Sequence, residues 1–517
     1  MSSVLVLTVI GIYFAGLFAI SYFTTRNIDN QSFYLGNRRS PWYIIAIAMI
    51  GTSISGVTFV SVPGYVLTDH FSYIQMVLGF VLGYFVVAYV LLPLYYRLNL
   101  TSIYGYLQQR FGFFSYKTGA VFFLISRTLG SAFRLYIVAI VLQKALFDAW
   151  NIPFYVTVFI TILLIFLYTR KGGIKTVIWT DTIQTIVLIA AVILCMYEIA
   201  DNMNLNFGGM VKTIADSNLS RIWFFDNWTD SHFFFKQFLA GAFTTITMTG
   251  LDQDQMQKNL SCRNVKDAKK NMISYSLAFL PINIIFLSLG VLLVFFAQQN
   301  GILIPEKTDD LFPTIATGIN PATGELYLGT VTAILFLLGI ISAAYSSADS
   351  ALTALTTSFT VDILGIKNDD KKLQRKRMFV HIGMAVMLGA VIVLFRLINN
   401  QSVVKSIYTV AGYTYGPLLG LFAFGIFTKR KIRDRFAPIV AILSPVLCYI
   451  ISINSEKWLW GYKFGFEILI LNGLITFLGL LFISFFPRPH PRNDKSRNDM
   501  PYSPKCGDKS HSTQPVE

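Results

Sequence analysis

Long apolar runs recur along nearly the whole chain, and each is close to the ~20 residues that an α-helix needs to cross a lipid bilayer. The lengths of these runs predict about thirteen membrane-spanning helices. They are expected near residues 3–23, 42–66, 74–96, 118–143, 152–169, 177–199, 236–251, 271–297, 327–357, 377–397, 403–427, 435–453 and 464–486. Only 13% of the residues are charged, whereas about a quarter are charged in soluble proteins. The sequence therefore predicts an all-α polytopic membrane protein.

Basic residues are concentrated in alternate gaps between the predicted spans. Arg38 and Arg39 follow the first span, and a stretch from Lys258 to Lys270 follows the seventh, whereas gaps such as 299–324 carry more acid than base. Because cytoplasmic loops are enriched in Lys and Arg, this alternation predicts an N-terminus outside the cell and a cytoplasmic C-terminus. We expect a multi-pass protein of the plasma or inner membrane.

The chain divides into a membrane domain, residues 1–486, and a short polar end, residues 487–517. The polar end is rich in Pro, Asn, Asp, Lys and Ser, and this composition is typical of a disordered tail. The net charge of +15 lies mostly in the loops and in this tail, so nucleic acid is not an expected partner. The bilayer is the expected environment, and no obligatory protein partner is indicated.

One apolar stretch carries an unusual number of oxygen-bearing side chains, Ser342 to Ser350. On a helix, Ala343, Ser346 and Ser347 share one face, and Asp349 with Ser350 continues it one turn later. A row of hydroxyls that ends in a carboxylate is costly in hydrocarbon, so it must face protein, water or an ion. Hard cations bind oxygen ligands, and this helix is a source of them. The alternative for each single Ser is a bond to its own helix or to a neighbouring one.

The second span is interrupted by small and polar residues between Gly51 and Thr58. Unwound backbone at membrane depth is tolerated where it lines a cavity or binds something, although close helix packing is an equal alternative. The seventh span, 236–251, is interrupted in the same way by Gly241, Gly250 and four Thr. Weak helices at matching places in two halves indicate an inverted-repeat transporter with a site at the midplane.

Several strings in this order resemble the sodium/solute symporter family, which includes sodium–glucose, proline, iodide and sialic acid symporters. They are Tyr106–Gly112, Gly172–Gln184, Asp252–Leu260 and Ala343–Ser347. The resemblance covers roughly residues 3–486. It implies thirteen spans of LeuT architecture, with inverted five-helix repeats at about 42–199 and 236–427, one extra N-terminal helix and two C-terminal helices. It also implies alternating access driven by a sodium gradient.

The resemblance also implies residues for the coupling ion, Na⁺. The expected sodium ligands are the carbonyls of Gly51, Ile54 and Ala343 with the hydroxyls of Ser346 and Ser347. A candidate second cation site comprises Asp181, Ser346, Asp349 and Ser350. Related sialic acid symporters have two hydroxyls where this chain has Asp349 and Ser350, so the carboxylate is a departure. The number of sodium ions therefore stays open at one or two.

Arg134 lies in the middle of the fourth span, where an unpaired guanidinium is costly. Arg is suited to a bidentate grip on a carboxylate, although an internal ion pair is the alternative for Arg134 and for Arg127. By the resemblance, the solute-binding residues are Ser53, Ser55, Thr58, Gln75 and Arg134. Sialic acid or a similar acidic sugar is the leading solute. A neutral sugar, an amino acid and another organic acid are the alternatives.

Other classes of protein fit the sequence less well. A sensor would need a longer signalling segment than the tail supplies, and a channel would need a continuous polar lining. A proton-coupled permease with Asp181 and Asp349 as proton carriers remains an alternative to sodium coupling. The five His and four Cys show neither catalytic nor metal-ligand spacing, so we expect no enzyme activity.

Overall fold

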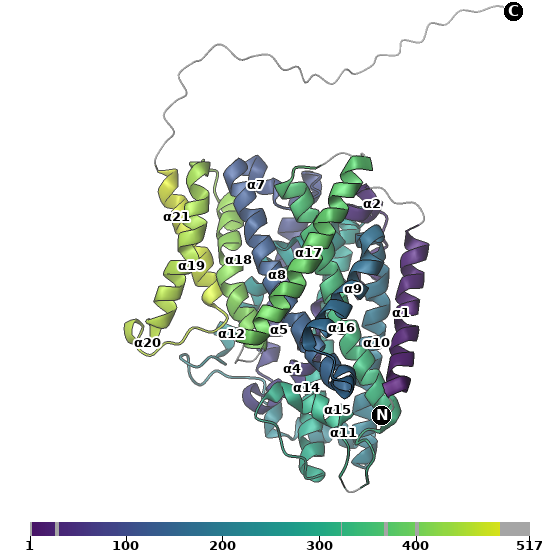
Figure 1. Cartoon of the computed structure of the whole chain (residues 1–517). Coiled ribbons are helices and arrows are strands. Elements are labelled where there is room, and N and C mark those ends of the chain that lie inside the picture. Colours follow the sequence, from purple (N-terminus) through teal and green to yellow (C-terminus); the bar gives the residue numbers. More distant parts are fainter. Residues whose placement is uncertain (1–2, 26–29, 322, 367–370, 399–402, 486–517) are drawn as a thin grey trace, which may run out of the picture.

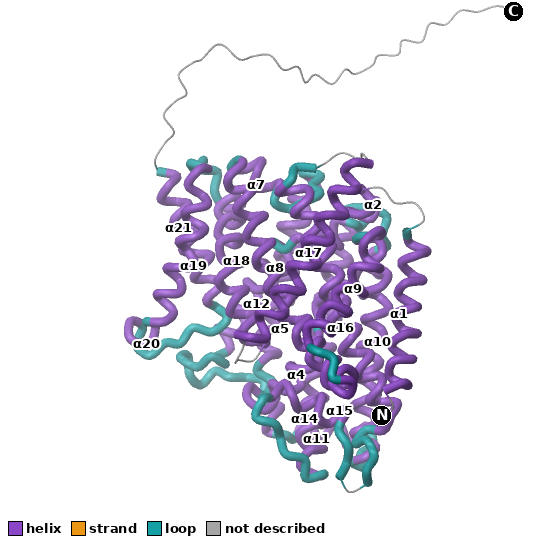
Figure 2. Tube along the Cα trace, viewed as in Figure 1, coloured by secondary structure: helices purple, strands orange, loops and turns teal. Residues whose placement is uncertain are grey.

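The computed structural model describes residues 3–25, 30–321, 323–366, 371–398 and 403–485. The described residues form helices joined by loops, as Figure 2 shows, which confirms the predicted all-α class. The predicted tail, 487–517, lies outside the described residues. The first helix starts at one end of the bundle, and the last described helix ends at the opposite end (Figure 1).

The helices follow the predicted apolar runs closely. The helices of the first half are α1 (Ser3–Thr24), α2 (Asn30–Leu35), α3 (Trp42–Ser53), α4 (Gly56–Asp69), α5 (Tyr73–Val86), α6 (Leu92–Arg97), α7 (Gly105–Arg110), α8 (Phe113–Leu142), α9 (Phe154–Gly172), α10 (Ile174–Asn202) and α11 (Phe207–Ala215). Those of the second half are α12 (Phe234–Thr245), α13 (Gln253–Leu260), α14 (Val265–Gln299), α15 (Leu311–Thr317), α16 (Gly329–Ser358), α17 (Lys371–Ile398), α18 (Val403–Phe427), α19 (Ala437–Ile453), α20 (Ser455–Trp458) and α21 (Ile468–Ser484).

Among the described residues, nine helices are long and apolar enough to cross a membrane, or ten when the bent pair α3–α4 counts as one span. Two further apolar helices, within α9 and α21, are shorter. The seventh predicted span corresponds to α12 and a π-helical turn, Ile246–Gly250. Each predicted range therefore contains a helix, whereas the count of thirteen crossings stays a prediction.

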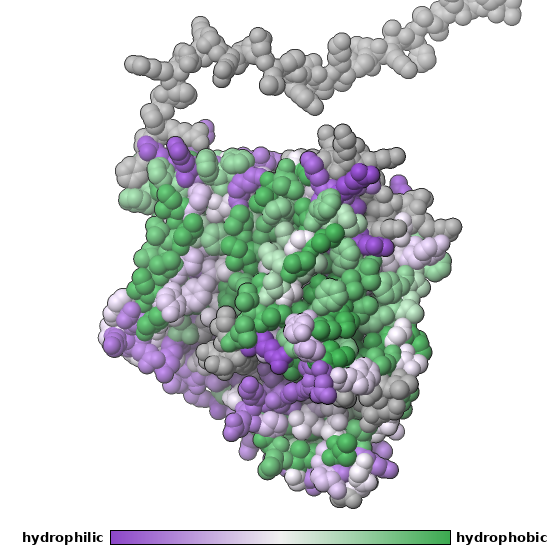
Figure 3. Space-filling view, in the orientation of Figure 1, coloured by the Kyte–Doolittle hydropathy of each residue, from purple (hydrophilic) through white to green (hydrophobic). Residues whose placement is uncertain are grey.

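The face of the molecule seen in Figure 3 carries a broad apolar band, with hydrophilic residues above and below it. On α19, the exposed side chains Ile439, Ile442, Val446 and Tyr449 recur every three or four residues, so one whole face of this helix is apolar and uncovered. Such a face suits contact with lipid chains. In contrast, 78% of the most apolar 18-residue stretch within Gly329–Ile363 is buried, so α16 lies at the centre of the bundle.

Glycines allow two of the inner helices to touch along their backbones. A Cβ atom at Gly79 of α5 would lie 2.0 Å from the carbonyl oxygen of Phe238, and one at Gly241 of α12 would lie 2.1 Å from that of Met76. Only glycine fits at such a distance, as in the small-residue interfaces of membrane helices. The pair α5–α12 is therefore fixed by close packing on one side of the central cavity.

Candidate functional site

The second predicted span is broken in the middle, which confirms the predicted interruption. Helix α3 ends at Ser53 and α4 begins at Gly56, with a bend of 61° between them. Ile54 (φ −82°, ψ 83°) and Ser55 (φ −76°, ψ 171°) have non-helical backbone angles. The last carbonyls of a helix lose their regular partners at such an end, so the backbone oxygens near Gly51 and Ile54 become available as ligands.

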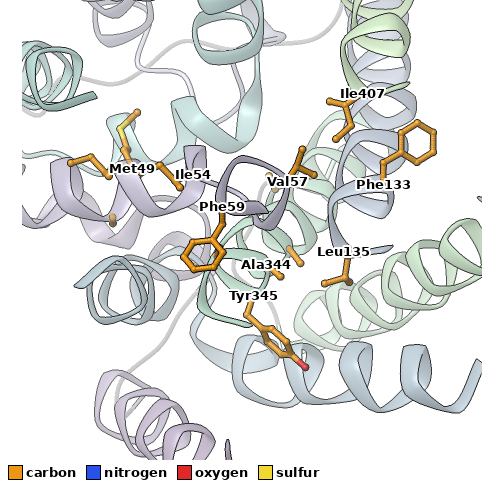
Figure 4. Packing of buried hydrophobic residues seen from close by; sticks show 14 of the residues in the cluster. Met49, Ile54, Val57, Phe59, Phe133, Leu135, Ala344, Tyr345 and Ile407 are labelled. Atoms are coloured by element: carbon orange, nitrogen blue, oxygen red, sulfur yellow. The ribbon is translucent and has the colours of Figure 1, made fainter. Parts of the chain in front are cut away.

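The break lies against the hydroxyl-bearing helix α16. A Cβ atom on Gly56 would be 3.9 Å from both Ala344 Cβ and Ile340 Cγ1. Figure 4 shows Ile54, Val57 and Phe59 around the break, with Ala344 and Tyr345 of α16 close by. The structure therefore brings together the two elements from which the resemblance assembles a sodium site.

The two serines of that site differ in their contacts. Ser346 Oγ is fully buried beside the Asp181 carboxylate, and it makes no hydrogen bond of regular geometry with any described residue. Ser347 Oγ accepts a hydrogen bond of 3.3 Å from Arg134 Nη1. A buried hydroxyl without a partner is costly, and coordination of a cation would satisfy it.

The residues of the candidate second cation site do not all face one another. The Asp181 carboxylate lies near Ser346 and is ion-paired with Lys258 through Oδ2, while its Oδ1 has no partner among the described residues. Asp349 Oδ2 accepts a hydrogen bond of 2.9 Å from the Tyr168 hydroxyl, and its Oδ1 is also unpartnered within the described chain. Ser350 points elsewhere, because its hydroxyl donates to Asp254 at 2.5 Å.

Lys258 was expected in a basic loop on the evidence of the sequence, and this expectation is wrong. Its side chain is fully buried, and its ammonium contacts the Asp181 carboxylate and the Thr52 hydroxyl. The alternation of basic and acidic gaps predicted a loop here because α13 is too short and too polar to resemble a buried helix. A lone Lys within the otherwise uncharged run from Gln255 to Leu260 is the one signal that the sequence offered.

A cavity with both polar and aromatic walls lies beside the break. Ser53, Ser55, Thr58 and Arg134 all line it, as the sequence predicted for the solute site. The rest of its wall is Val57, Val62, Tyr65, Tyr73, Phe80, Tyr84, Arg127, Thr244, Thr245, Met248, Thr249, Gln255, Phe279, Ile407 and Tyr408. The wall is therefore rich in aromatic rings with a few convergent polar groups, which is the usual composition of a small-molecule site.

The two arginines of α8 have different partners. Arg127 is ion-paired with Asp254 and lies 3.8 Å from Asp252, so the internal ion pair considered for it exists. Arg134 makes no ion pair with any described residue, and its Nη1 donates a hydrogen bond to the neutral hydroxyl of Ser347. Arg134 therefore lines the cavity without a direct ion-pair partner, although the Asp252 carboxylate is near enough to act on its charge.

Gln75 does not line this cavity. Its Nε2 donates to the His232 carbonyl at 2.9 Å, and its Oε1 accepts from the Phe224 amide at 3.2 Å. Both groups belong to the loop that precedes α12. The amide of Gln75 thus anchors a loop to α5, whereas the sequence predicted that it contacts solute.

A buried pair of tyrosines was missed by the sequence analysis. The Tyr275 hydroxyl donates to Ser53 Oγ at 2.5 Å and lies 2.7 Å from the Tyr84 hydroxyl. Because Ser53 accepts this bond, its own hydrogen is free to point into the cavity. Nothing in the sequence joins α5, α14 and the break, so this contact could not be found without the fold.

A membrane bundle with a central polar cavity and a broken helix belongs to the class of helical membrane transporters. Residues 33–434 match the model of the sodium:solute symporter family. The chain therefore belongs to this family, and the predicted coupling of solute transport to sodium is confirmed at the family level.

Known relatives cover most of the chain. The sodium/sialic acid symporter NanT of Aliivibrio fischeri is 27% identical over 90% of this chain and 91% of its own length. The sodium/sialic acid symporter SiaT of Proteus mirabilis is 25% identical over 90% and 93%. Mouse sodium-coupled monocarboxylate transporter 1 is 28% identical over 80% and 68%.

A solved structure of a sodium-coupled sialic acid symporter, described as outward-open and substrate-bound, shares the fold. Its TM-score is 0.77, with 23% identity over 94% of this chain and 98% of the other. The similarity extends over almost the full length of both chains, so the arrangement of the whole bundle is common to them.

Proposed function

We propose that this protein imports a carboxylated solute together with sodium, and that sialic acid or a similar acidic sugar is that solute. The observation that carries the proposal is the guanidinium of Arg134, which lines the cavity without a direct ion pair to any described residue. A carboxylate would neutralise it and form bidentate hydrogen bonds. A neutral sugar would leave this charge without a partner.

The hydroxyls at the break support a polyol. Ser53, Ser55 and Thr58 line the cavity at the break. Ser53 and Thr58 keep some exposure, although they lie in the middle of a buried span. A solute with a carboxylate at one end and several hydroxyls at the other would contact both Arg134 and these hydroxyls. The two sialic acid symporters that match over 90% of the chain support the same solute.

A smaller monocarboxylate is the second candidate. The sodium-coupled monocarboxylate transporters are as similar in sequence over 80% of the chain, and Arg134 would bind their class of solute equally well. The hydroxyls at the break would then have less to contact.

We propose the same sodium ligands as the sequence predicted: the carbonyls of Gly51, Ile54 and Ala343 and the hydroxyls of Ser346 and Ser347. The buried Ser346 hydroxyl supports them, because it makes no hydrogen bond of regular geometry with any described residue. For a second cation, the unpartnered oxygens of Asp181 and Asp349 support two of the candidate ligands. The bond from Ser350 to Asp254 argues against the fourth.

The proposed architecture is a membrane domain of thirteen crossings with inverted repeats at about 42–199 and 236–427. Both repeats would then begin with an interrupted helix, since a non-helical break at Leu251 and Asp252 separates the π-helical turn from α13. The N-terminus would lie outside and the C-terminus in the cytoplasm. Rocking of the elements around the break would open the cavity to each side in turn.

Uptake by purified protein in proteoliposomes tests the proposal. An inward sodium gradient should drive accumulation of labelled sialic acid, and replacing sodium with choline at fixed pH should stop it. Arg134→Ala should lower uptake of carboxylated solutes at least tenfold, because a charged hydrogen-bonded pair is lost. Uptake that follows a proton gradient without sodium would contradict the proposal, and so would unchanged uptake by Arg134→Ala.

A further inference from the structure

Helix α13 has three glutamines two residues apart, and two of them connect the helix to distant parts of the chain. Gln253 accepts a hydrogen bond of 2.9 Å from the Ile103 amide and donates one of 3.0 Å to the Thr101 carbonyl. Gln257 donates to the Tyr34 carbonyl at 2.7 Å and to the Thr357 hydroxyl at 3.0 Å. Both amides therefore have structural partners from distant parts of the chain.

Gln255 is different from these two. It lines the central cavity together with Arg127 and Arg134. Its side chain is only 4% exposed, and its Oε1 makes no hydrogen bond with any described residue. The Oε1 of Gln257 also has no partner among these residues, but Gln257 does not line the cavity. A buried amide oxygen without a partner is unfavourable, so such a group in a binding cavity indicates a ligand that completes it.

The neighbours of Gln255 fix its position. The preceding Asp254 carboxylate is held by Arg127 of α8 and by Ser350 of α16. Asp252 caps the helix by accepting a hydrogen bond of 2.8 Å from the Asp254 amide. The first turn of α13 is thus bound to two helices, which holds the backbone of Gln255 beside the cavity. A rigidly held polar group of this kind is suited to recognition.

We propose that Gln255 binds a second polar group of the solute, a hydroxyl or an acylamino group remote from the carboxylate on Arg134. This inference rests on the proposed function and narrows its solute class. An amide side chain both donates and accepts, so it matches either group. A short monocarboxylate has no such group, and the cavity therefore favours a carboxylated solute with polar substituents.

The matched variants Gln255→Met and Gln257→Met test this assignment, because they place the same change at a cavity position and at a structural position of one helix. The KM for sodium-driven uptake of labelled sialic acid should rise about tenfold in Gln255→Met. The kcat should change little, because the lost contact exists before and during transport. Gln257→Met should change protein stability without changing this KM.

Competition by unlabelled pyruvate distinguishes recognition of the carboxylate from recognition of the remote polar group. Its inhibition constant should be the same in wild type and in Gln255→Met, because pyruvate would contact Arg134 alone. An unchanged KM for sialic acid in Gln255→Met would overturn the inference, and so would an equal weakening of sialic acid and pyruvate.

A further test uses the wild-type protein alone, so it does not require any variant to fold. Wild type should bind sialic acid at least tenfold more tightly than pyruvate, and the reverse order would overturn the role of Gln255 while leaving the proposed carboxylate symport intact. Sodium-driven uptake of neither acid would contradict the proposed function itself.

Discussion

The residues that bear the chemistry differ in how visible they are in the sequence. Arg134 and the serines of α16 stand out because a polar side chain in an apolar run demands an explanation. Gln255 and Tyr275 do not stand out, since neither residue type is unusual in its own segment. Their importance comes from what lies opposite them on other helices, and a single sequence contains no such information.

The double variant Ser346→Ala with Ser347→Ala tests the proposed sodium ligands. Uptake should fall to the level measured without a sodium gradient, because two of the five proposed oxygen ligands are lost. Sodium-dependent uptake of labelled sialic acid in proteoliposomes measures the effect. Ser342→Ala is the matched control, since Ser342 lies on the same helix and donates to the Tyr13 hydroxyl at 2.9 Å. Sodium-stimulated uptake that survives the double change would refute the assignment.

Lys258 and Asp181 form a fully buried ion pair, which leads to a prediction about stability. Lys258→Met alone should destabilise the protein by about 3 kcal/mol, because the Asp181 carboxylate then remains buried without its partner. The double variant Lys258→Met with Asp181→Asn should recover most of that loss. Thermal unfolding followed by size-exclusion chromatography measures both. A double variant no more stable than the single one would show that the pair is not the cause.

At the scale of elements, the predicted ranges and the observed helices agree because a long apolar run in a membrane satisfies its backbone hydrogen bonds by forming a helix. The break between α3 and α4 was also predictable, since Gly and hydroxyl residues cluster there. The short polar helix α13 was not, because its stability comes from partners such as Thr101, Thr357 and Arg127 rather than from its own sequence.

The contact between α3 and α10 depends on a glycine at the proposed sodium site. A Cβ atom on Gly51 would lie 2.0 Å from Thr185 Oγ1 and 3.3 Å from the Asp181 carbonyl oxygen. Gly51→Val should therefore push the two helices apart, cost about 2 kcal/mol of stability and weaken sodium activation.

Gly130 of α8 is the control for this change, because, apart from its chain neighbours and its own helix backbone, no atom of the described residues lies within 4 Å of its added Cβ. Gly130→Ala should keep sodium-driven uptake and stabilise its helix by up to ~1 kcal/mol. Thermal unfolding and the sodium concentration for half-maximal uptake measure both variants. Equal effects of the two substitutions would contradict a specific contact at Gly51.

At the scale of the whole molecule, the loop that precedes α12 is tied to the helix bundle by a cluster of charges. His232 lies 2.8 Å from Asp69 at the end of α4 and 2.9 Å from Asp230. The hydrogen bond to Asp69 raises the pKa of His232, and the His232 amide lowers the pKa of Asp230. Since the His232 carbonyl also accepts from Gln75, this loop is joined to two helices at once.

The raised pKa of His232 gives the loop a dependence on pH. Protonated His232 stabilises the attachment of the loop. This stabilisation is fully present below the pKa of about 6.5 that His has in the unfolded chain, and it is lost as pH rises through the higher pKa of the folded state. Asp230 stays ionised throughout this window because its pKa is lowered. Backbone amides of residues 221–234 should therefore exchange faster with deuterium above neutral pH, after correction for intrinsic exchange. His232→Gln should remove this pH dependence, and His70→Gln should keep it. A profile that His232→Gln leaves unchanged would assign the attachment of the loop to the hydrogen bonds of Gln75 instead.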